Sequence, residues 1–290
     1  MSVPIAPSVG DISRHPTPAT VRGPRAQLHW ALADALTMMR RNLTHVRYVP
    51  EKLIDVTIQP SMFVLLFVYV FGKAIRVPGG HYQDFLMAGI FVQSLAFASA
   101  STAVSIAEDL TSGAVERFRS LPMARAAILL GRTGADLAAS LLGLTVLSVT
   151  GLVVGWAPHT DAGSVIGAYA LLALFAYAMS WVGVMLGTLV RAPDAAQGIA
   201  FVVMFPITFL ANSFVPLTSL PSGLRTVAEW NPASAMIAAA RHLFGNPENI
   251  PHNAAWPLTH PVLAAALWPL IILAIVVPIA IGRYRRVAAR

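Results

Sequence analysis

The sequence predicts an all-α membrane protein with six transmembrane helices. Of its 290 residues, 56% are hydrophobic and only 11% are charged, whereas roughly a quarter of the residues in soluble domains are charged. Several apolar runs reach the roughly 20 residues that a helix needs to cross about 30 Å of hydrocarbon. The chain has no cysteine, which excludes disulfide frameworks and thiolate metal sites.

The first 49 residues divide into two predicted segments. Residues 1–25 are rich in proline and small polar residues and lack the apolar core of a secretory signal, so we expect a disordered cytoplasmic tail. Residues 26–49 predict an amphipathic helix in the cytoplasmic membrane interface, because apolar residues recur along one helical face. A soluble helix packed on a partner domain is the alternative. The apolar face carries Leu28, Leu32, Leu36, Met39 and Leu43.

Residues 50–290 predict one six-span membrane domain, in which apolar stretches alternate with short polar turns. The third span follows a charged segment at 108–132 and ends near residue 156, and residues 191–194 form a predicted tight turn. The other predicted spans are residues 53–71, 85–106, 165–190, 199–214 and 262–281.

Two helix-like pieces before the last span, residues 224–230 and 233–244, are too short to cross a membrane. Prolines separate them from their neighbours. Trp230, Arg241 and His242 stand at the ends of their apolar faces, which is typical of interfacial or re-entrant helices.

The distribution of basic residues predicts that both termini are cytoplasmic. With six spans, sixteen of the 20 lysines and arginines lie inside and four outside, as the positive-inside rule requires. The net charge of +7 therefore indicates the cytoplasmic side and anionic lipid headgroups rather than nucleic acid. The four outside residues are Lys73, Arg76, Arg225 and Arg241.

The segment at 108–132 is the most polar stretch between two long apolar runs. Ser112 and Gly113 precede its charged turn and Pro122 follows it, which predicts a short charged cytoplasmic helix; an ordinary basic loop is the alternative. Arg132 and Asp136 stand four residues apart at the start of the third span, the spacing of an intrahelical ion pair.

The chain lacks the motifs of an autonomous energy source or a hydrolytic enzyme. A nucleotide-binding P-loop needs Ser or Thr directly after its Gly-Lys pair. Here Ala74 follows Gly72-Lys73, so the motif is not present. The eight histidines never pair at three- or four-residue spacing, which argues against a helical metal site. The span centres carry no charge of the kind that ion-coupled carriers use. These absences predict an energy source outside the chain.

Two groups of motifs carry a family resemblance. The first is Glu108-Asp109, then ERFRSLPM at 116–123 and GR at 131–132. The second is ANSFVP at 211–216, followed by LP at 220–221, WNP at 230–232 and RHLFG at 241–245. From about residue 26 onward the chain resembles the membrane subunits of type 2 ABC exporters, particularly those of the daunorubicin-resistance type.

The resemblance implies a fold and two sets of site residues. Members have an N-terminal interface helix, six spans, a cytoplasmic coupling helix and two short extracellular helices before the last span. Residues 112–121 correspond to the coupling helix, and the second and fifth spans face the export path; for the path residues, simple packing is the alternative. The ATPase-coupling residues are Glu108, Asp109, Ser112, Gly113, Glu116, Arg117, Phe118, Arg119 and Leu121. The path residues are Gln93, Ser94, Phe97, Ser101, Phe205, Phe209 and Asn212.

The resemblance also implies a function. We expect a permease subunit of the bacterial plasma membrane that exports amphipathic drug-like or lipid-like molecules by alternating access. It is not itself an enzyme: ATP and Mg2+ bind a separate ABC ATPase subunit, two copies of which serve a homodimer or paralogous heterodimer of membrane subunits. An exporter of polysaccharide or lipid-linked glycan and an ion-coupled carrier are the alternatives.

Overall fold

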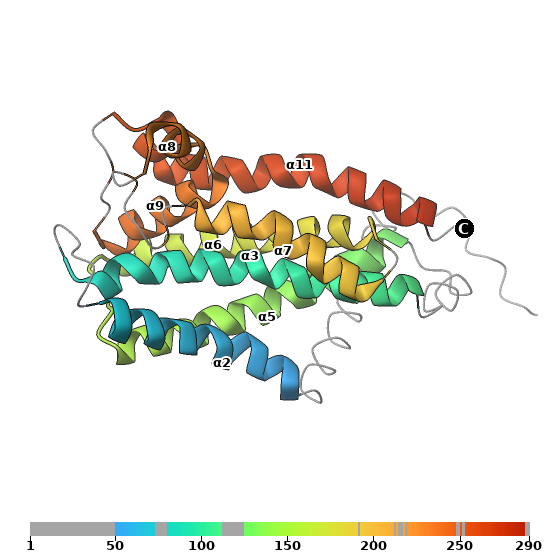
Figure 1. Cartoon of the computed structure of the whole chain (residues 1–290), viewed down its shortest axis with the longest axis horizontal. Coiled ribbons are helices and arrows are strands. Elements are labelled where there is room, and N and C mark those ends of the chain that lie inside the picture. The colour runs from blue at the N-terminus through green and yellow to red at the C-terminus, as the bar shows by residue number, and fades with distance from the viewer. Residues whose placement is uncertain are drawn as a thin grey trace, which may run out of the picture.

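The structure, a computed structural model, is a bundle of long helices with short helices at one end (Figure 1). It describes residues 50–72, 80–111, 125–190, 192–211, 213, 217, 220–247, 250 and 253–287. Within these ranges every regular element is helical. The long elements are α2 (Pro50–Leu66) with the π-helical turn η2 (Phe67–Phe71), α3 (Tyr82–Thr111), α5 (Arg125–Val153), α6 (Ala162–Gly187), α7 (Pro193–Phe209) and α11 (Pro261–Val287). The short ones are α8 (Ser222–Glu229), α9 (Pro232–Phe244) and α10 (Trp256–Thr259).

Four described helices are long and apolar enough to cross a membrane: α3, α5, α6 and α11. Two shorter apolar helices accompany them, Ile58–Val70 and Pro193–Phe209. The described part of the chain is therefore all-helical, and its long apolar helices are those of a multi-pass membrane protein. The predicted tail at 1–25 and the predicted interface helix at 26–49 lie outside the described residues.

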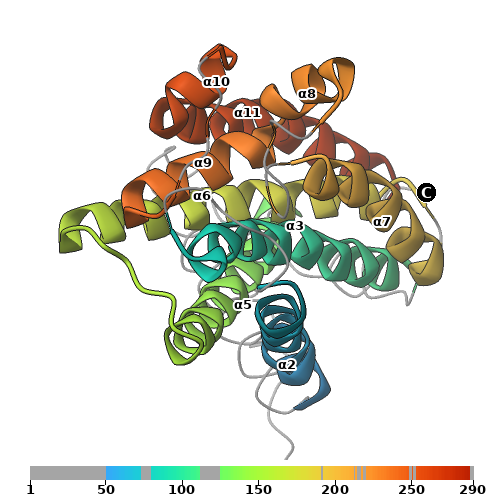
Figure 2. The ribbon, with the colours of Figure 1, turned by 60° about the vertical axis from the view of Figure 1, so that its left-hand side comes forward.

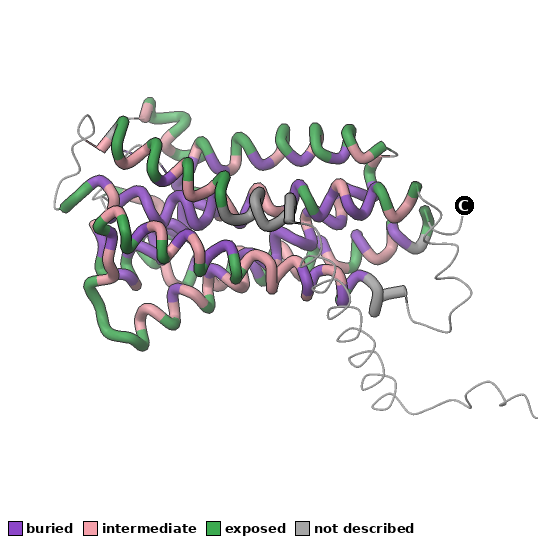
Figure 3. The backbone as a smooth tube through the Cα atoms, turned by 90° about the horizontal axis from the view of Figure 1, so that it is seen from below, coloured by how far each residue is buried: buried purple, intermediate pink, exposed green. Residues whose placement is uncertain are grey.

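Helix α3 forms the centre of the bundle. Figure 2 shows it between α5 on one side and α6 and α9 on the other, with α7 alongside. Twenty of its 30 residues are buried, more than a helix with one lipid-facing side would bury. Buried residues face inward along the bundle, and exposed ones line its outside (Figure 3).

Small residues let α6 lie directly against α3. A Cβ atom on Gly183 would lie 2.4 Å from the carbonyl oxygen of Ser99 and 2.9 Å from the Cβ of Thr102. Gly187 is one turn later on the same face, where a Cβ would lie 2.5 Å from the carbonyl oxygen of Ala103. Such close backbone contact is a common way of joining transmembrane helices.

The short helices gather at one end of the bundle, beside the N-terminal end of α3 (Figure 1). Helices α8 and α9 begin and end within two residues of the two short helical pieces predicted at 224–230 and 233–244. Asn231 caps α9, accepting a hydrogen bond from the Ala233 amide at 2.9 Å. Arg241 lies in the last turn of α9, near the predicted helix end, and the rest of the bundle buries it completely.

The fifth predicted span is displaced toward the N-terminus. Helix α7 begins at Pro193 and ends at Phe209, so Pro193 and Asp194 belong to the helix instead of the predicted turn. Proline suits the first helical position, because its fixed φ matches the helix and its missing N–H would have no partner there.

Candidate functional site

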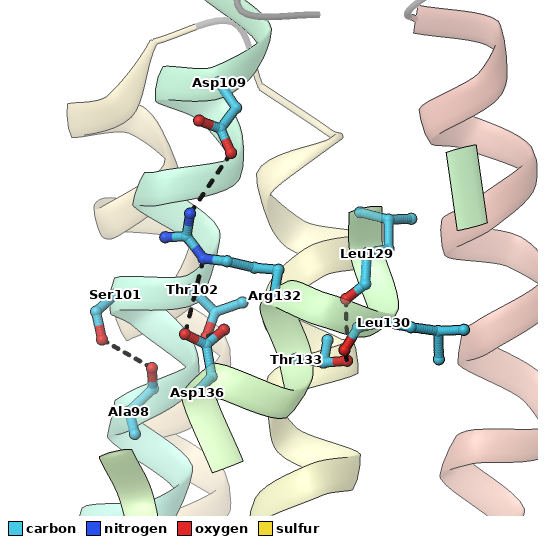
Figure 4. Close-up of polar contacts among 9 residues, drawn as sticks. All are labelled: Ala98, Ser101, Thr102, Asp109, Leu129, Leu130, Arg132, Thr133 and Asp136. Atoms are coloured by element: carbon cyan, nitrogen blue, oxygen red, sulfur yellow. Dashed lines mark hydrogen bonds and ion pairs between the residues drawn. The ribbon is translucent and has the colours of Figure 1, made fainter. Parts of the chain in front are cut away.

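The end of the bundle opposite α8 and α9 contains a polar cluster between α3 and α5. Arg132 Nη1 lies 3.5 Å from Asp109 Oδ2 in the last turns of α3, and Arg132 Nε lies 3.7 Å from Asp136 Oδ1 on its own helix. Thr102 donates a hydrogen bond from Oγ1 to Asp136 Oδ2 at 2.9 Å. Figure 4 shows the guanidinium between the two carboxylates. The Arg132–Asp136 pair predicted from spacing is confirmed, and the contacts with Asp109 and Thr102 extend it to α3.

This cluster is only partly shielded from solvent. The side chains of Arg132, Asp136 and Asp109 are 21%, 25% and 38% exposed, while Thr102 is buried. One cation thus neutralises two acidic groups that would otherwise repel each other across the α3–α5 contact. Its geometry is suited to holding two helix ends together, with Thr102 fixing the carboxylate orientation.

The cluster adjoins the predicted ATPase-coupling segment. Glu108 is exposed and Asp109 is half-buried in the ion pair with Arg132. The coupling helix at 112–121 lies outside the described residues, between α3 and α5 in sequence. The coupling residues in that position are Ser112, Gly113, Glu116, Arg117, Phe118, Arg119 and Leu121.

The path residues predicted on α3 do not share one environment. Gln93 is buried in the bundle, whereas Ser94 and Phe97 are half-buried and Ser101 is exposed. The last three recur at helical spacing and share a face of α3. Ser101 donates its hydroxyl to the carbonyl oxygen of Ala98 at 2.9 Å.

Phe97 of α3 contacts the first of three phenylalanine side chains that form a row on α7. Its ring centroid lies 5.3 Å from that of Phe201, and the rings of Phe205 and Phe209 stack at 4.1 Å with an interplanar angle of 16°. The side chains of Phe201, Phe205 and Phe209 are 44%, 52% and 42% exposed. We call Phe97, Phe201, Phe205 and Phe209 the phenylalanine strip.

A shallow apolar depression lies within the phenylalanine strip. It is lined by Phe201, Val202, Phe205 and Pro206. Such a surface suits flat aromatic groups or acyl chains, because stacking and apolar burial need no polar partner. The last predicted path residue, Asn212, lies outside the described residues.

Two functional candidates were missed in the sequence. Phe201 belongs to a repeat of phenylalanines at four-residue spacing with Phe205 and Phe209, a signal that could have revealed it. Thr102 could not be identified in this way, since its partner Asp136 is 34 residues away. The described residues contain no cluster of three or more His, Cys, Asp or Glu side chains that could hold a metal ion.

The described part of the chain is thus a bundle of long apolar helices with the Arg132 cluster at one end and exposed phenylalanine rings on α7. The profile of the ABC-2 type transporter family matches residues 34–244, and the chain belongs to this family. It is the transmembrane subunit of an ABC exporter.

Named relatives agree with this assignment. The chain is 29% identical over 221 residues to the daunorubicin resistance ABC transporter permease protein DrrB1 of Streptomyces coeruleorubidus, covering 76% of this chain and 78% of the relative. It is 27% identical over 194 residues to the doxorubicin resistance ABC transporter permease protein DrrB of Mycobacterium tuberculosis, covering 67% of each chain. A putative transport permease, ycf38 of Pyropia yezoensis, is 24% identical over 225 residues, covering 75% of this chain and 76% of the relative. All three relatives carry the name permease.

Proposed function

We propose that this subunit exports amphipathic drug-like or lipid-like molecules by alternating access, driven by ATP hydrolysis in a separate ATPase subunit. The phenylalanine strip is the observation that supports this class of transported molecule. Phe201, Phe205 and Phe209 present half-exposed rings on one helix, and the depression among them is lined by apolar side chains. A planar aromatic drug can stack there while its polar groups face water. The names of the daunorubicin and doxorubicin resistance relatives support the same class.

We place the motor contact beside the Arg132 cluster. Residues 112–121 join α3 to α5 in sequence, and the ion pair of Arg132 with Asp109 ties these two helices together. A push on the connecting segment would therefore reach both helices at once. In this proposal Glu116, Arg117 and Arg119 contact the ATPase subunit, which binds ATP and Mg2+.

The proposed topology has six spans and both termini in the cytoplasm of a bacterial cell. Besides the four long helices, α7 has 17 residues, about 25 Å of helix, and α2 with η2 covers a longer distance. The C-terminal ends of α3 and α11 lie at the same end of the bundle (Figure 1). This agrees with the basic bias that places residues 108–132 and the C-terminus inside. Helices α8 and α9 would then form the outer, partly membrane-inserted cap.

The proposed assembly contains two membrane subunits and two ATPase subunits. A half-exposed aromatic surface on a monomer is best suited to a path shared with a second subunit, since a lone bundle would expose it to lipid only. The second membrane subunit is either a copy of this chain or a paralogue.

The test is ATP-dependent doxorubicin uptake into inverted membrane vesicles containing this chain and its ATPase subunit. We expect uptake that disappears when the Walker lysine of the ATPase subunit is replaced and persists when the proton gradient is collapsed. Uptake by the membrane subunit alone, or uptake that follows the proton gradient and ignores ATP depletion, would support an ion-coupled carrier instead.

A further inference from the structure

Arg241 is a fully buried cation at the end of the bundle that carries the short helices. It lies in the last turn of α9, and its side chain is 0% exposed. Nε donates a hydrogen bond to the carbonyl oxygen of Phe85 at 2.9 Å, and Nη2 donates one to the carbonyl oxygen of Ser213 at 3.4 Å. The guanidinium carbon lies 3.5 Å from the centroid of the Phe85 ring, the position of a cation–π contact.

These contacts join three elements. Phe85 is in the first turn of α3, and Ser213 follows the end of α7. Ser213 also bonds back to α7, because its hydroxyl donates to the carbonyl oxygen of Thr208 at 3.0 Å. Arg241 thus links α9 simultaneously to the beginning of α3 and to the end of α7.

A second bond attaches the other end of α9 to α7. Asn231 caps α9, and its Nδ2 donates to the carbonyl oxygen of Ile207 at 2.7 Å. The first end of α9 therefore contacts the last turn of α7 directly, and the other end is linked to it through Ser213. Thr208, between these two points, is only 1% exposed.

The backbone of α3 closes the third side of this contact. A Cβ atom on Gly89 would lie 2.6 Å from the carbonyl oxygen of Ser213 and 2.9 Å from its Cα. Gly89 is one turn after Phe85, so both face the same neighbours. At Gly89, the backbone of α3 therefore lies directly against the backbone of Ser213.

We propose that Arg241 is a positioning residue that keeps the end of α7 attached to α3 and α9 throughout the transport cycle. Breaking the contact would leave a buried guanidinium away from its carbonyl acceptors, which is strongly unfavourable. The three elements therefore move together, and the phenylalanine strip on α7 keeps a fixed position relative to Phe97 on α3. The cycle-wide part of this proposal rests on the proposed function.

The absence of native cysteine allows a direct test with single cysteines. In Thr208→Cys the new thiol is enclosed by the contact, whereas in Leu224→Cys the thiol is at an exposed position of α8, outside the phenylalanine strip, and serves as the control. The labelling rate with a small membrane-permeant maleimide is measured for each in the assembled complex, without nucleotide and after trapping with ATP and vanadate. We expect protection of Thr208→Cys in both states and labelling of Leu224→Cys in both. Labelling of Thr208→Cys at the control rate after trapping would overturn the proposal.

The role of Arg241 itself is tested by adding Arg241→Gln to Thr208→Cys without nucleotide. We expect loss of protection at Thr208→Cys and restored protection with Arg241→Lys. Should Arg241→Gln fail to fold, Asn231→Ser is the second variant: serine retains the helix cap but is too short to replace the amide bond to Ile207, so protection should again fall. Full protection in both Arg241→Gln and Asn231→Ser would contradict the proposal. These nucleotide-free measurements are independent of the cargo, so they stand even if doxorubicin is not transported.

Discussion

Arg132 of α5 and Asp109 of α3 form an ion pair, with 3.5 Å between Nη1 and Oδ2. Their helices are the two that flank residues 112–124 in sequence. Arg132 also contacts Asp136, which in turn accepts a hydrogen bond from Thr102 of α3. The base of the predicted coupling segment is therefore closed by two polar links between α3 and α5.

Removing the cation from this cluster should destabilise the bundle. In Arg132→Gln, Asp109 and Asp136 lose their common partner, and we expect a loss of about 1 kcal/mol of stability, since partly exposed ion pairs contribute little more. A double-mutant cycle with Asp109→Asn, measured by thermal unfolding in detergent, gives the coupling energy between Arg132 and Asp109. Additive effects of the two substitutions would show that the pair contributes no coupling energy.

Charge reversal in the coupling segment should weaken ATPase docking. We expect Arg117→Glu with Arg119→Glu to lower co-purification of the ATPase subunit while the amount of membrane-inserted protein stays the same. The matched control is Arg283→Glu with Arg286→Glu, where both arginines are exposed at the end of α11. Unchanged co-purification for the 117/119 variant, or an equal loss in the control, would contradict the assignment of the coupling helix.

A side chain on Gly183 should force α6 away from α3. The added Cβ of Gly183→Ala would lie 2.4 Å from the Ser99 carbonyl oxygen, and overpacking of this kind costs about 1–3 kcal/mol. Gly282→Ala in α11 is the control, because a Cβ there meets no atom within 4 Å; it should be neutral or stabilising by up to about 1 kcal/mol. The midpoints of thermal unfolding of the two variants are compared, and we expect a lower one for Gly183→Ala. Equal midpoints would contradict the close packing of α6 against α3.

Loss of a ring from the phenylalanine strip should weaken drug binding more than it affects the motor. An aromatic contact contributes about 0.5–1.5 kcal/mol beyond simple burial, so Phe205→Ala should raise the KM for doxorubicin transport about two- to tenfold. Basal ATPase activity should not change. Leu270→Ala, at an exposed position on α11, is the control. An unchanged KM in Phe205→Ala would show that the Phe205 ring does not contact the drug on the transport path.

The helices were predictable because their causes are local. Apolar runs and proline punctuation located the long helices and both α8 and α9, and four-residue spacing identified the pair of Arg132 with Asp136. The start of α7 was misplaced because Pro193 favours both a turn and the first position of a helix. The local pattern alone does not distinguish these two roles.

Contacts between distant segments were not predictable. The position of Arg241 near the end of an apolar helix predicted an interfacial or re-entrant helix, but it did not reveal the carbonyl acceptors of Phe85 and Ser213 around the buried guanidinium. Thr102 likewise has its partner Asp136 on another helix, 34 residues away in sequence. Both roles depend on which helices pack together, and a single sequence contains no direct record of that packing.

The ratio of doxorubicin transported to ATP hydrolysed tests the central claim most directly. It is measured in proteoliposomes containing the membrane and ATPase subunits, for wild type, Arg132→Gln and the control Arg225→Gln. Arg225 forms a comparable ion pair with Glu229, 2.8 Å long, within α8 at the opposite end of the bundle. If force enters through the joined ends of α3 and α5, Arg132→Gln lowers the ratio and Arg225→Gln does not. Ratios equal to wild type in both variants, or lowered equally in both, would contradict the account.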